Sequence, residues 1–545
     1  MGRPKSSASG VSKRVKKDSQ RVSTAGSKNL TLKPKKTRSV KEAYKSKTAT
    51  SPPTTLAPVD KRKRSRSEGL TADDTSSNKR PRTSRTQRDQ AKGRLAKPRK
   101  PEPSATTPVI NKVPEEILTI LVFGGGENGE LGLGPERNSA LRPVLNPFLD
   151  PSSPTAYHIV EFACGGMHTV ALSANNKIIT WGVNDNKALG RNTDWEGGLR
   201  DIDADSDDED DENMNPLEST PTEIPAKHFP AGTRFSQVAA GDSCSFALTD
   251  TGLVYGWGTF RNSQGTNCFG YDTDGKIITT QETPVQIRGI PKITQIVCGS
   301  NHALALDAEG NIWAWGYNEQ NQFGRHLFGR RQDSFVPNQV RVCRGKAKYI
   351  ASGEYHSFAI DLQDNVWAWG ANSFGETGDA ETAGSDSAFL RSPVKIRQLC
   401  QKDVTILAGG AHHSVAVTAG GQCFIWGRID AGQLGVAFTR KQIEDGKHIR
   451  CDDRGKPRIC LRPTVVPDIG QAVHVACGTD HTVFINKSGA AYSSGFGFQG
   501  QLGLASNDDV EVATLIGAKS VKDRVLIRAG AGGNVSIVAG FAKSG

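Results

Sequence analysis

The body of the chain repeats a short alternation of apolar and polar positions. The stretch ACGGMHTVALSANNKIITWG at residues 163–182 contains two such segments, HTVAL and KIITWG, on either side of the polar turn SANN. Alternation with a period of two is typical of a strand that buries one face, and a polar turn between two such strands predicts a hairpin. The stretch therefore predicts a pair of short antiparallel strands.

The same unit occurs six times along the chain. Its other copies occupy residues 239–258, 297–316, 351–370, 408–427 and 476–495. In every copy two glycines stand 17 positions apart, as Gly165 and Gly182 do in the first. An apolar segment precedes each copy, and a segment that usually contains proline follows it. Four short strands per repeat are typical of a β-propeller blade.

A seventh copy is divided between the two ends of the repeat region. Residues 524–540 (RVLIRAGAGGNVSIVAG) contain the first half of a unit, and residues 120–134 (ILVFGGGENGELGLG) contain the second half. Pairing the two halves would close the ring and remove both exposed sheet edges. We therefore predict an all-β protein with a seven-bladed β-propeller over residues 113–545, closed by its N- and C-terminal segments.

Charge divides the chain into two unlike parts. The whole chain carries a net charge of +12, but residues 1–110 hold 30 basic and 8 acidic side chains, a net of +22, which leaves −10 for the remainder. Residues 1–112 are also poor in aromatic residues, so we expect a disordered basic arm. Its cluster Lys61, Arg62, Lys63 and Arg64 predicts an import signal, and the arm as a whole predicts contact with DNA. The alternative is a solvated tail.

Several other function classes are disfavoured. No apolar run is long enough to span a membrane, and the N-terminus lacks a secretory signal. The ten cysteines show no CxxC spacing, so we expect structural thiols and no metal site. The segments GGGENG (124–129) and GFGFQG (495–500) fit a dinucleotide motif but occupy the same repeat position, so turn glycines explain them. We expect no cofactor.

Recurring aromatic and imidazole side chains are expected to be architectural. A histidine that recurs around a ring is better explained by fixing the blades than by catalysis, and a tryptophan before each blade glycine is better explained by packing. The histidines are His168, His302, His356, His413 and His481, and the tryptophans are Trp181, Trp257, Trp315, Trp369 and Trp426.

The positions that vary between copies predict the functional surface. The residues between the first glycine and the histidine, such as Asp242 and Ser243, should emerge on one end of the ring together with the turns that follow the WG glycines. A rigid frame with varied polar loops predicts a protein-binding face, although solvated loops are the alternative. Two insertions interrupt the repeats: residues 192–219, with an acidic tract at 201–212, and residues 259–283, which predict a protruding hairpin.

Two local motifs resemble the signatures of the regulator of chromosome condensation family. They are FACGGMHTVAL (162–172) and GVNDNKALGRNT (182–193), while AGDS (240–243) followed by WGTFRNSQG (257–265) resembles the segment typical of its exchange factors. The resemblance covers residues 119–542. It implies a nuclear, chromatin-bound guanine-nucleotide exchange factor for the small GTPase Ran, without covalent chemistry. A chromatin or protein-interaction scaffold without exchange activity is the alternative.

The resemblance also implies binding residues. A wedge that pushes on the phosphate-binding loop of the GTPase maps to Phe260, Arg261, Asn262, Ser263, Gln264, Gly265, Thr266 and Asn267. Other GTPase contacts map to Glu127, Asp242, Asn301 and His412. Asn301 lacks the charge of the family's carboxylate, and residues 529–534 lack a histidine that the family has. A loop toward the nucleosome maps to Arg330 and Arg331. The implied partners are Ran, histones and DNA, and a nuclear import receptor.

Overall fold

The computed structural model describes residues 108–196, 214–325, 334–343, 346–385 and 388–542. The import cluster Lys61–Arg64, the acidic tract 201–212, and Arg330 and Arg331 lie outside these residues, as does the arm up to residue 107. Within the described part, no helix is long and apolar enough to cross a membrane. The three α-helices in this part are single-turn elements in loops: α1 (Pro216–Ser219), α2 (Arg440–Glu444) and α3 (Lys519–Lys522).

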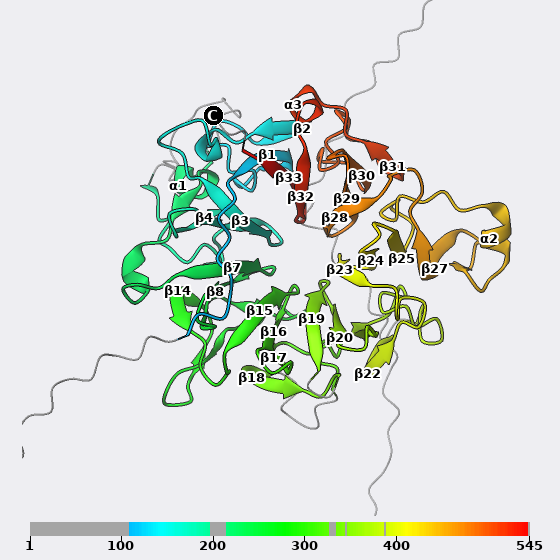
Figure 1. Cartoon of the computed structure of the whole chain (residues 1–545), viewed down its shortest axis with the longest axis horizontal. Helices are drawn as coiled ribbons and strands as arrows, with labels where there is room; N and C mark the ends of the chain where they lie inside the picture. Colours follow the sequence, from blue (N-terminus) through cyan, green and yellow to red (C-terminus); the bar gives the residue numbers. More distant parts are fainter. Residues whose placement is uncertain (1–107, 197–213, 326–333, 344–345, 386–387, 543–545) are drawn as a thin grey trace, which may run out of the picture. The chain divides into compact units, whose positions relative to one another are not determined.

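In the described residues, the repeats form seven antiparallel sheets arranged as the blades of a ring (Figure 1). Blade 1 contains β1 (Leu118–Gly125), β2 (Ser139–Leu145), β32 (Leu526–Ala531) and β33 (Val535–Phe541). Blade 2 contains β3 (Ile159–Cys164), β4 (His168–Ser173), β5 (Ile178–Gly182) and β6 (Thr222–Glu223). Blade 3 contains β7 (Phe235–Ala240), β8 (Cys244–Thr249), β9 (Val254–Gly258) and β14 (Gln281–Gln286).

The remaining blades follow in chain order. Blade 4 contains β15 (Ile293–Cys298), β16 (His302–Asp307), β17 (Ile312–Gly316) and β18 (Ser334–Val340). Blade 5 contains β19 (Ala347–Ser352), β20 (His356–Asp361), β21 (Val366–Ala371) and β22 (Phe389–Lys395). Blade 6 contains β23 (Val404–Gly409), β24 (His413–Thr418), β25 (Cys423–Arg428), β26 (Ile449–Cys451) and β27 (Pro457–Val465). Blade 7 contains β28 (Ala472–Cys477), β29 (His481–Asn486), β30 (Ala491–Gly495) and β31 (Val510–Leu515).

Blade 1 closes the ring with strands from both ends of the repeat region. Strand β1 pairs antiparallel with β33 from Leu118 opposite Phe541 to Gly124 opposite Val535. The strand order is β2-β1-β33-β32, and every residue of β1 is buried. The prediction of a seven-bladed propeller with a divided blade is therefore confirmed.

Backbone hydrogen bonds join each blade to the next around one end of the central channel. Seven N–H···O=C bonds of 2.8 to 3.3 Å form a closed circle. The donor and acceptor pairs are Gly166 to Gly241, Asp242 to Ser300, Ser300 to Glu354, Glu354 to Gly410, Ala411 to Thr479, Thr479 to Gly532 and Gly533 to Gly166. Because each loop is fixed to both neighbours, the side chains at this end stand on a rigid frame.

The recurring histidines add a second set of contacts between blades. Each lies at the start of the second strand, is buried, and places Nε2 2.8 to 3.0 Å from a hydroxyl of the next blade: Ser245, Ser357, Ser414, Thr482 or Ser536. The Ser245 hydroxyl donates in turn to the backbone carbonyl of Ala188, which also accepts the indole N–H of Trp257. The prediction that these histidines and tryptophans are architectural agrees with this arrangement.

Two glycines per repeat are required by the same contacts. A Cβ on Gly353 would lie 2.2 Å from Cε1 of His356, so the histidine ring leaves no room for a side chain there. Gly370 has a φ of +101°, and a Cβ there would lie 2.6 Å from the carbonyl oxygen of Tyr355. The constant spacing of the glycines thus reflects close packing of the loop, the histidine and the third strand.

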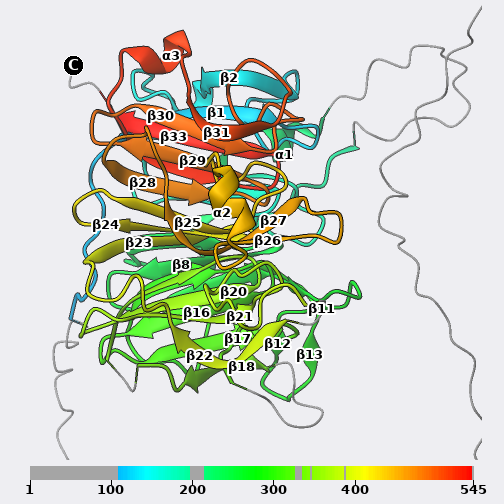
Figure 2. The same cartoon turned by 90° about the vertical axis from the view of Figure 1, so that its right-hand side faces the viewer.

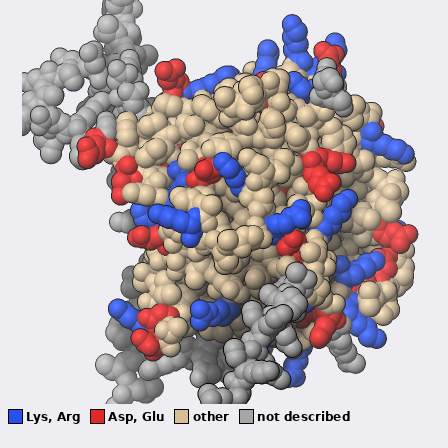
Figure 3. Space-filling model, turned by 60° about the vertical axis from the view of Figure 1, so that its left-hand side comes forward, with Lys and Arg blue, Asp and Glu red and all other residues tan. Residues whose placement is uncertain are grey.

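A short segment before β1 packs on the propeller body. The Asn111 side chain is buried, and its Nδ2 donates to the carbonyls of Thr249 at 2.8 Å and Ile293 at 2.9 Å. Residues 108–112, placed in the arm by the sequence, are therefore held against blades 3 and 4. On the face drawn in Figure 3, acidic and basic side chains are interspersed, so that face presents no continuous field of one sign.

Candidate functional site

The varied loops of the blades surround a cavity at the end of the channel that carries the circle of hydrogen bonds. The cavity measures about 510 Å³. Its wall contains the loops before the second strands of the blades, and the loops after the third strands of blades 3, 4 and 5. Of the predicted binding residues, it includes Asp242, Arg261, Asn262, Ser263, Asn301 and His412. Side chains separated by up to 170 positions in the sequence thus share one concave surface.

Asp242 stands at the rim with an exposed carboxylate. Its backbone N–H belongs to the circle of hydrogen bonds, which fixes the residue, and its Oδ2 accepts from the Ser243 hydroxyl at 3.0 Å. The opposing position on blade 2 is Gly166, where a Cβ would lie 2.5 Å from Oδ1 of Asp242. The carboxylate is held in place and accessible, as a contact for a basic group requires.

A hairpin rises beside the cavity from the insertion after β9. It consists of β10 (Phe260–Arg261) and β11 (Asn267–Cys268), joined by a turn in which Asn262 Oδ1 accepts the backbone N–H groups of Gln264 and Thr266. Ser263 donates through its N–H and its hydroxyl to the Glu319 carboxylate, both at 2.9 Å. The turn is exposed but held from one side by blade 4, so it is a firm projection.

Phe260 differs from the other residues predicted for the wedge. Its side chain has no exposed surface and packs against Phe246 and Phe269, with ring centroids 6.2 and 6.3 Å away. It cannot itself contact a partner in this conformation, so the prediction of a direct contact is corrected. Phe260 instead anchors the hairpin in the core, because burying an aromatic ring fixes the strand that carries it.

The insertion contains a second hairpin that the sequence did not distinguish. Strands β12 (Gly270–Tyr271) and β13 (Ile277–Ile278) pair directly after the first hairpin, and Figure 2 shows them near β11. Tyr271 and Ile277 are largely exposed on it. Residues 259–283 therefore form two consecutive hairpins where one was expected.

Two further predicted contacts differ in their access to solvent. Asn301 is only 5% exposed, and its Oδ1 accepts a hydrogen bond of 2.9 Å from Nε2 of Gln322. Glu127 is exposed in the loop after β1 of blade 1, outside the wall of the cavity. The Glu127 side chain is therefore accessible to a partner, whereas that of Asn301 offers little exposed surface.

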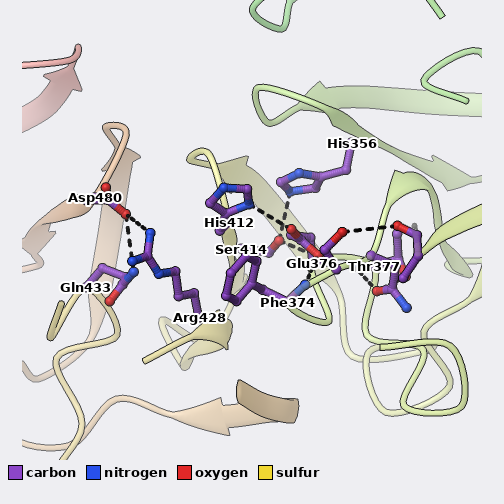
Figure 4. A network of polar contacts seen from close by, with 12 residues as sticks. His356, Phe374, Glu376, Thr377, His412, Ser414, Arg428, Gln433 and Asp480 are labelled. Atoms are coloured by element: carbon purple, nitrogen blue, oxygen red, sulfur yellow. Dashed lines mark hydrogen bonds and ion pairs between the residues drawn. The ribbon is translucent and has the colours of Figure 1, made fainter. Parts of the chain in front are cut away.

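His412 forms a hydrogen-bonded pair with a buried carboxylate. Its Nδ1 lies 3.0 Å from Oε1 of Glu376, and the two residues face each other in Figure 4. The side chain of His412 is 31% exposed, whereas that of Glu376 is fully buried. The Phe374 ring lies beside the imidazole, with centroids 4.6 Å apart. The histidine is therefore held on two sides and open on the side of the cavity.

Glu354 is a cavity residue that the sequence placed among the varied loops but not among the implied GTPase contacts. Its carboxylate accepts from the Thr479 hydroxyl at 2.8 Å and is 3.3 Å from that of Ser300, so it bridges loops of three blades. Burial, and to a lesser degree the charge of Asp242, raise the pKa of Glu354. Burial and the neighbouring Glu354 also raise the pKa of Tyr355 to about 12. Glu354 follows the first repeat glycine, Gly353, just as Asp242 follows Gly241. This shared repeat position was the feature of the sequence that could have identified Glu354 as a cavity residue.

The lining of the cavity is rich in carboxylate side chains. In the described residues, no group of three or more His, Cys, Asp or Glu side chains could hold a metal ion. The wall contains more acidic than basic side chains. Asp242, Glu319 and Glu354 contribute carboxylates, whereas Arg261 is the one basic side chain among the predicted binding residues. A concave acidic surface next to a projecting hairpin matches a protein partner that presents basic groups.

Comparisons with known proteins agree on one family. Residues 119–538 match a family model described as an RCC1-like domain. The guanine nucleotide exchange factor SRM1 of Saccharomyces cerevisiae is 37% identical over 78% of this chain and 87% of its own length. A solved structure of Prp20p from Saccharomyces cerevisiae, reported with its binding properties to Gsp1p and histones, has a TM-score of 0.70 and 35% identity, and covers 80% of this chain and 94% of that one. A solved structure of Kap60 bound to yeast RCC1 (Prp20) gives a TM-score of 0.70 at 33% identity, over 83% of this chain and 97% of that one.

Proposed function

The chain belongs to the family of RCC1-like domain proteins, and we propose that it is a guanine-nucleotide exchange factor for a Ran-type small GTPase, acting on chromatin. SRM1, to which it is similar along most of its length, is an exchange factor by name. Prp20p, which shares its fold at 35% identity, is described with binding to Gsp1p and histones. The activity is therefore supported by relatives that the chain covers almost completely.

The observation that carries the proposal is the joint placement of Asp242, His412 and the β10–β11 hairpin around one cavity. Small GTPases hold nucleotide through a phosphate-binding cradle and ordered switch segments. A partner that binds the nucleotide-free form more tightly must, by linkage, weaken nucleotide binding by the same factor. The acidic cavity supplies affinity for basic groups of the GTPase, and the hairpin is placed to displace its cradle. Exchange by this route needs no covalent step.

The alternative, a scaffold without exchange activity, does not require the hairpin. The loop after the third strand differs in length between blades, and among the described residues only that of blade 3 forms separate two-stranded hairpins, β10–β11 and β12–β13. Two hydrogen bonds from Ser263 to Glu319 fix the projection beside the cavity. A rigid projection next to a binding surface favours exchange over simple capture.

The arm is proposed to supply chromatin contact and nuclear import. Kap60 is bound to yeast RCC1 (Prp20) in a solved complex, and Prp20p is described with histone binding. In this chain the cluster Lys61–Arg64 is the proposed import signal, and Arg330 and Arg331 are proposed contacts with the nucleosome. The net charge of the first 110 residues favours binding to DNA phosphates.

Release of a fluorescent GDP analogue from a panel of purified small GTPases tests the exchange activity. We expect the full-length protein to accelerate release from the Ran-type GTPase and not from the others. Asp242→Ala should reduce kcat/KM roughly tenfold, as loss of a central charged contact does at an interface. Glu309→Ala, in the exposed β16–β17 turn at the other end of the ring, is the matched control and should behave as wild type. Absence of acceleration for every GTPase would overturn the proposal.

A further inference from the structure

Glu376 occupies a loop position whose ordinary task is visible in the other blades. In the loop after the third strand, one side-chain oxygen accepts the backbone N–H of the residue two positions earlier. Gln322, Gln433 and Gln501 do this through Oε1, at 2.8 to 3.0 Å. Glu376 does the same for Phe374 at 2.8 Å, and Glu130 for Asn128 at 2.8 Å. The cap needs only an acceptor oxygen, so the negative charge of Glu376 is not required for it.

The second oxygen of Glu376 makes a contact that Glu130 does not make. Oε1 of Glu376 lies 3.0 Å from Nδ1 of His412, which belongs to the next blade. The second oxygen of Glu130 instead accepts from the side chain of Asn128 at 3.2 Å, within its own loop. Two hydrogen bonds offset the desolvation cost of burying the Glu376 carboxylate. One caps the backbone N–H of Phe374 in the same loop, and the other joins the carboxylate to His412.

The hydrogen bond with Glu376 determines which imidazole nitrogen of His412 carries the hydrogen. An ionised carboxylate is a hydrogen-bond acceptor only, so Nδ1 of His412 must carry the hydrogen. In the neutral ring Nε2 is then the acceptor, and it is the nitrogen left for the cavity. Phe374, whose own N–H is capped by Glu376, packs against the imidazole and restricts its rotation (Figure 4).

We propose that Glu376 is a positioning residue that holds His412 in the tautomer protonated at Nδ1, so that Nε2 accepts a hydrogen bond from an N–H or O–H group of the bound GTPase. The inference rests on the proposed function, because it assigns the role of one contact in the exchange interface. The residue at this repeat position thus caps its own loop and also contacts a residue of the predicted binding surface.

The glutamine found in the other blades provides a conservative test. In Glu376→Gln, Oε1 is expected to cap Phe374, as it does for Gln322, and the amide Nε2 then faces His412. Gln322 shows this arrangement, since its Nε2 donates to Asn301, the residue that precedes its ring histidine as His412 precedes His413. A donor opposite Nδ1 selects the opposite tautomer, with the hydrogen on Nε2, so the polarity presented to the GTPase is reversed while the fold is kept.

Exchange kinetics and a double-mutant cycle measure the consequence. Glu376→Gln should lower kcat/KM for GDP release about tenfold, the effect of one reversed hydrogen bond at an interface. His412→Ala should cause a similar loss, and the double variant should lose no more than either single one. Glu130→Gln removes the same charge from the same loop position without a histidine partner and should retain wild-type activity. Losses that multiply in the double variant, or a fully active Glu376→Gln, would overturn the proposal.

A spectroscopic readout separates this proposal from the proposed function. In protein labelled with ¹⁵N-histidine, the His412 resonances, assigned by their loss in His412→Ala, should show a protonated Nδ1 in wild type and a protonated Nε2 in Glu376→Gln. If wild type releases no GDP from any GTPase, the exchange function fails, whereas the tautomer still reports whether Glu376 controls the ring. An unchanged tautomer in Glu376→Gln would overturn the positioning role even if exchange is observed.

Discussion

At the scale of single residues, the ring histidines show how a repeat can be held together by uncharged polar contacts. Burial lowers the pKa of His302, His356 and His413 to about 3 and that of His168 and His481 to about 4. They are therefore neutral at physiological pH. Each donates from Nε2 to a hydroxyl that itself donates to a carbonyl, so the hydrogen-bond polarity is consistent from blade to blade.

This arrangement predicts a loss of stability in mild acid. In the unfolded chain these histidines titrate near 6.5, so below that pH the unfolded state binds more protons than the folded state. Stability is then complete above about pH 6.5 and declines as the pH falls toward 4. Each histidine contributes about 1.4 kcal/mol per pH unit in this window. Thermal unfolding followed by circular dichroism at pH 7.5 and 5.5 should show a markedly lower Tm at 5.5. A Tm that is independent of pH would contradict the neutral ring.

At the scale of elements, blade 3 departs from the repeat where the hairpin leaves the ring. Cys244 stands where the other full repeats have histidine, and the insertion begins at the loop that elsewhere offers its carbonyl to the next blade. Aromatic packing replaces those hydrogen bonds: Phe246 lies 5.6 Å from Trp315 and 6.2 Å from Phe260. The junction between blades 3 and 4 is therefore packed by aromatic rings, and the β10–β11 hairpin extends from it.

The hairpin can be shortened without disturbing that junction. Replacing residues 262–266 by a two-residue Asn-Gly turn keeps Phe260 and the β10–β11 pairing, since such turns suit hairpins. We expect kcat/KM for GDP release to fall roughly 30-fold or more, the equivalent of about 2 kcal/mol at an interface hot spot. The same replacement of residues 272–276 in the second hairpin, which do not line the cavity, is the matched control. Equal activity of the two variants would remove the hairpin from the mechanism.

The sequence predicted the elements of the fold better than the contacts between their side chains. The blades, the division of blade 1 between the two ends of the repeat region, and the end of the ring that carries the varied loops followed from alternation and the constant glycine spacing. The pairing of Glu376 with His412 did not, because it joins side chains of two blades whose distance apart depends on the loop conformations. Phe260 was assigned to the contact surface because the resemblance maps the wedge to residues 260–267, whereas its burial depends on Phe246 and Phe269. The two hairpins in 259–283 share one composition, so the boundary between them left no signal.

At the scale of the whole molecule, closure of the ring and the division of charge lead us to propose separate tasks for separate parts of the chain. The β1–β33 pairing joins the ends of the repeat region, so the ring is closed by described residues, and the segment at 108–112 packs on it. The excess of positive charge lies before that segment, in residues 1–107, because residues 108–110 carry no charged side chain. Exchange and attachment to chromatin should therefore be separable.

A truncation that respects the packed segment tests this separation. Removing residues 1–107 keeps Asn111 and its hydrogen bonds to Thr249 and Ile293, so the propeller should remain folded. GDP release in solution should equal that of the full chain, whereas retention on nucleosome arrays should be lost. In the full chain, retention should fall steeply as salt rises, because binding to phosphates releases condensed counterions. Sedimentation with the arrays across a salt series measures both effects. Retention of the truncated protein would contradict the assignment to the arm and would favour a contact on the propeller, for which Arg330→Ala with Arg331→Ala is the next variant.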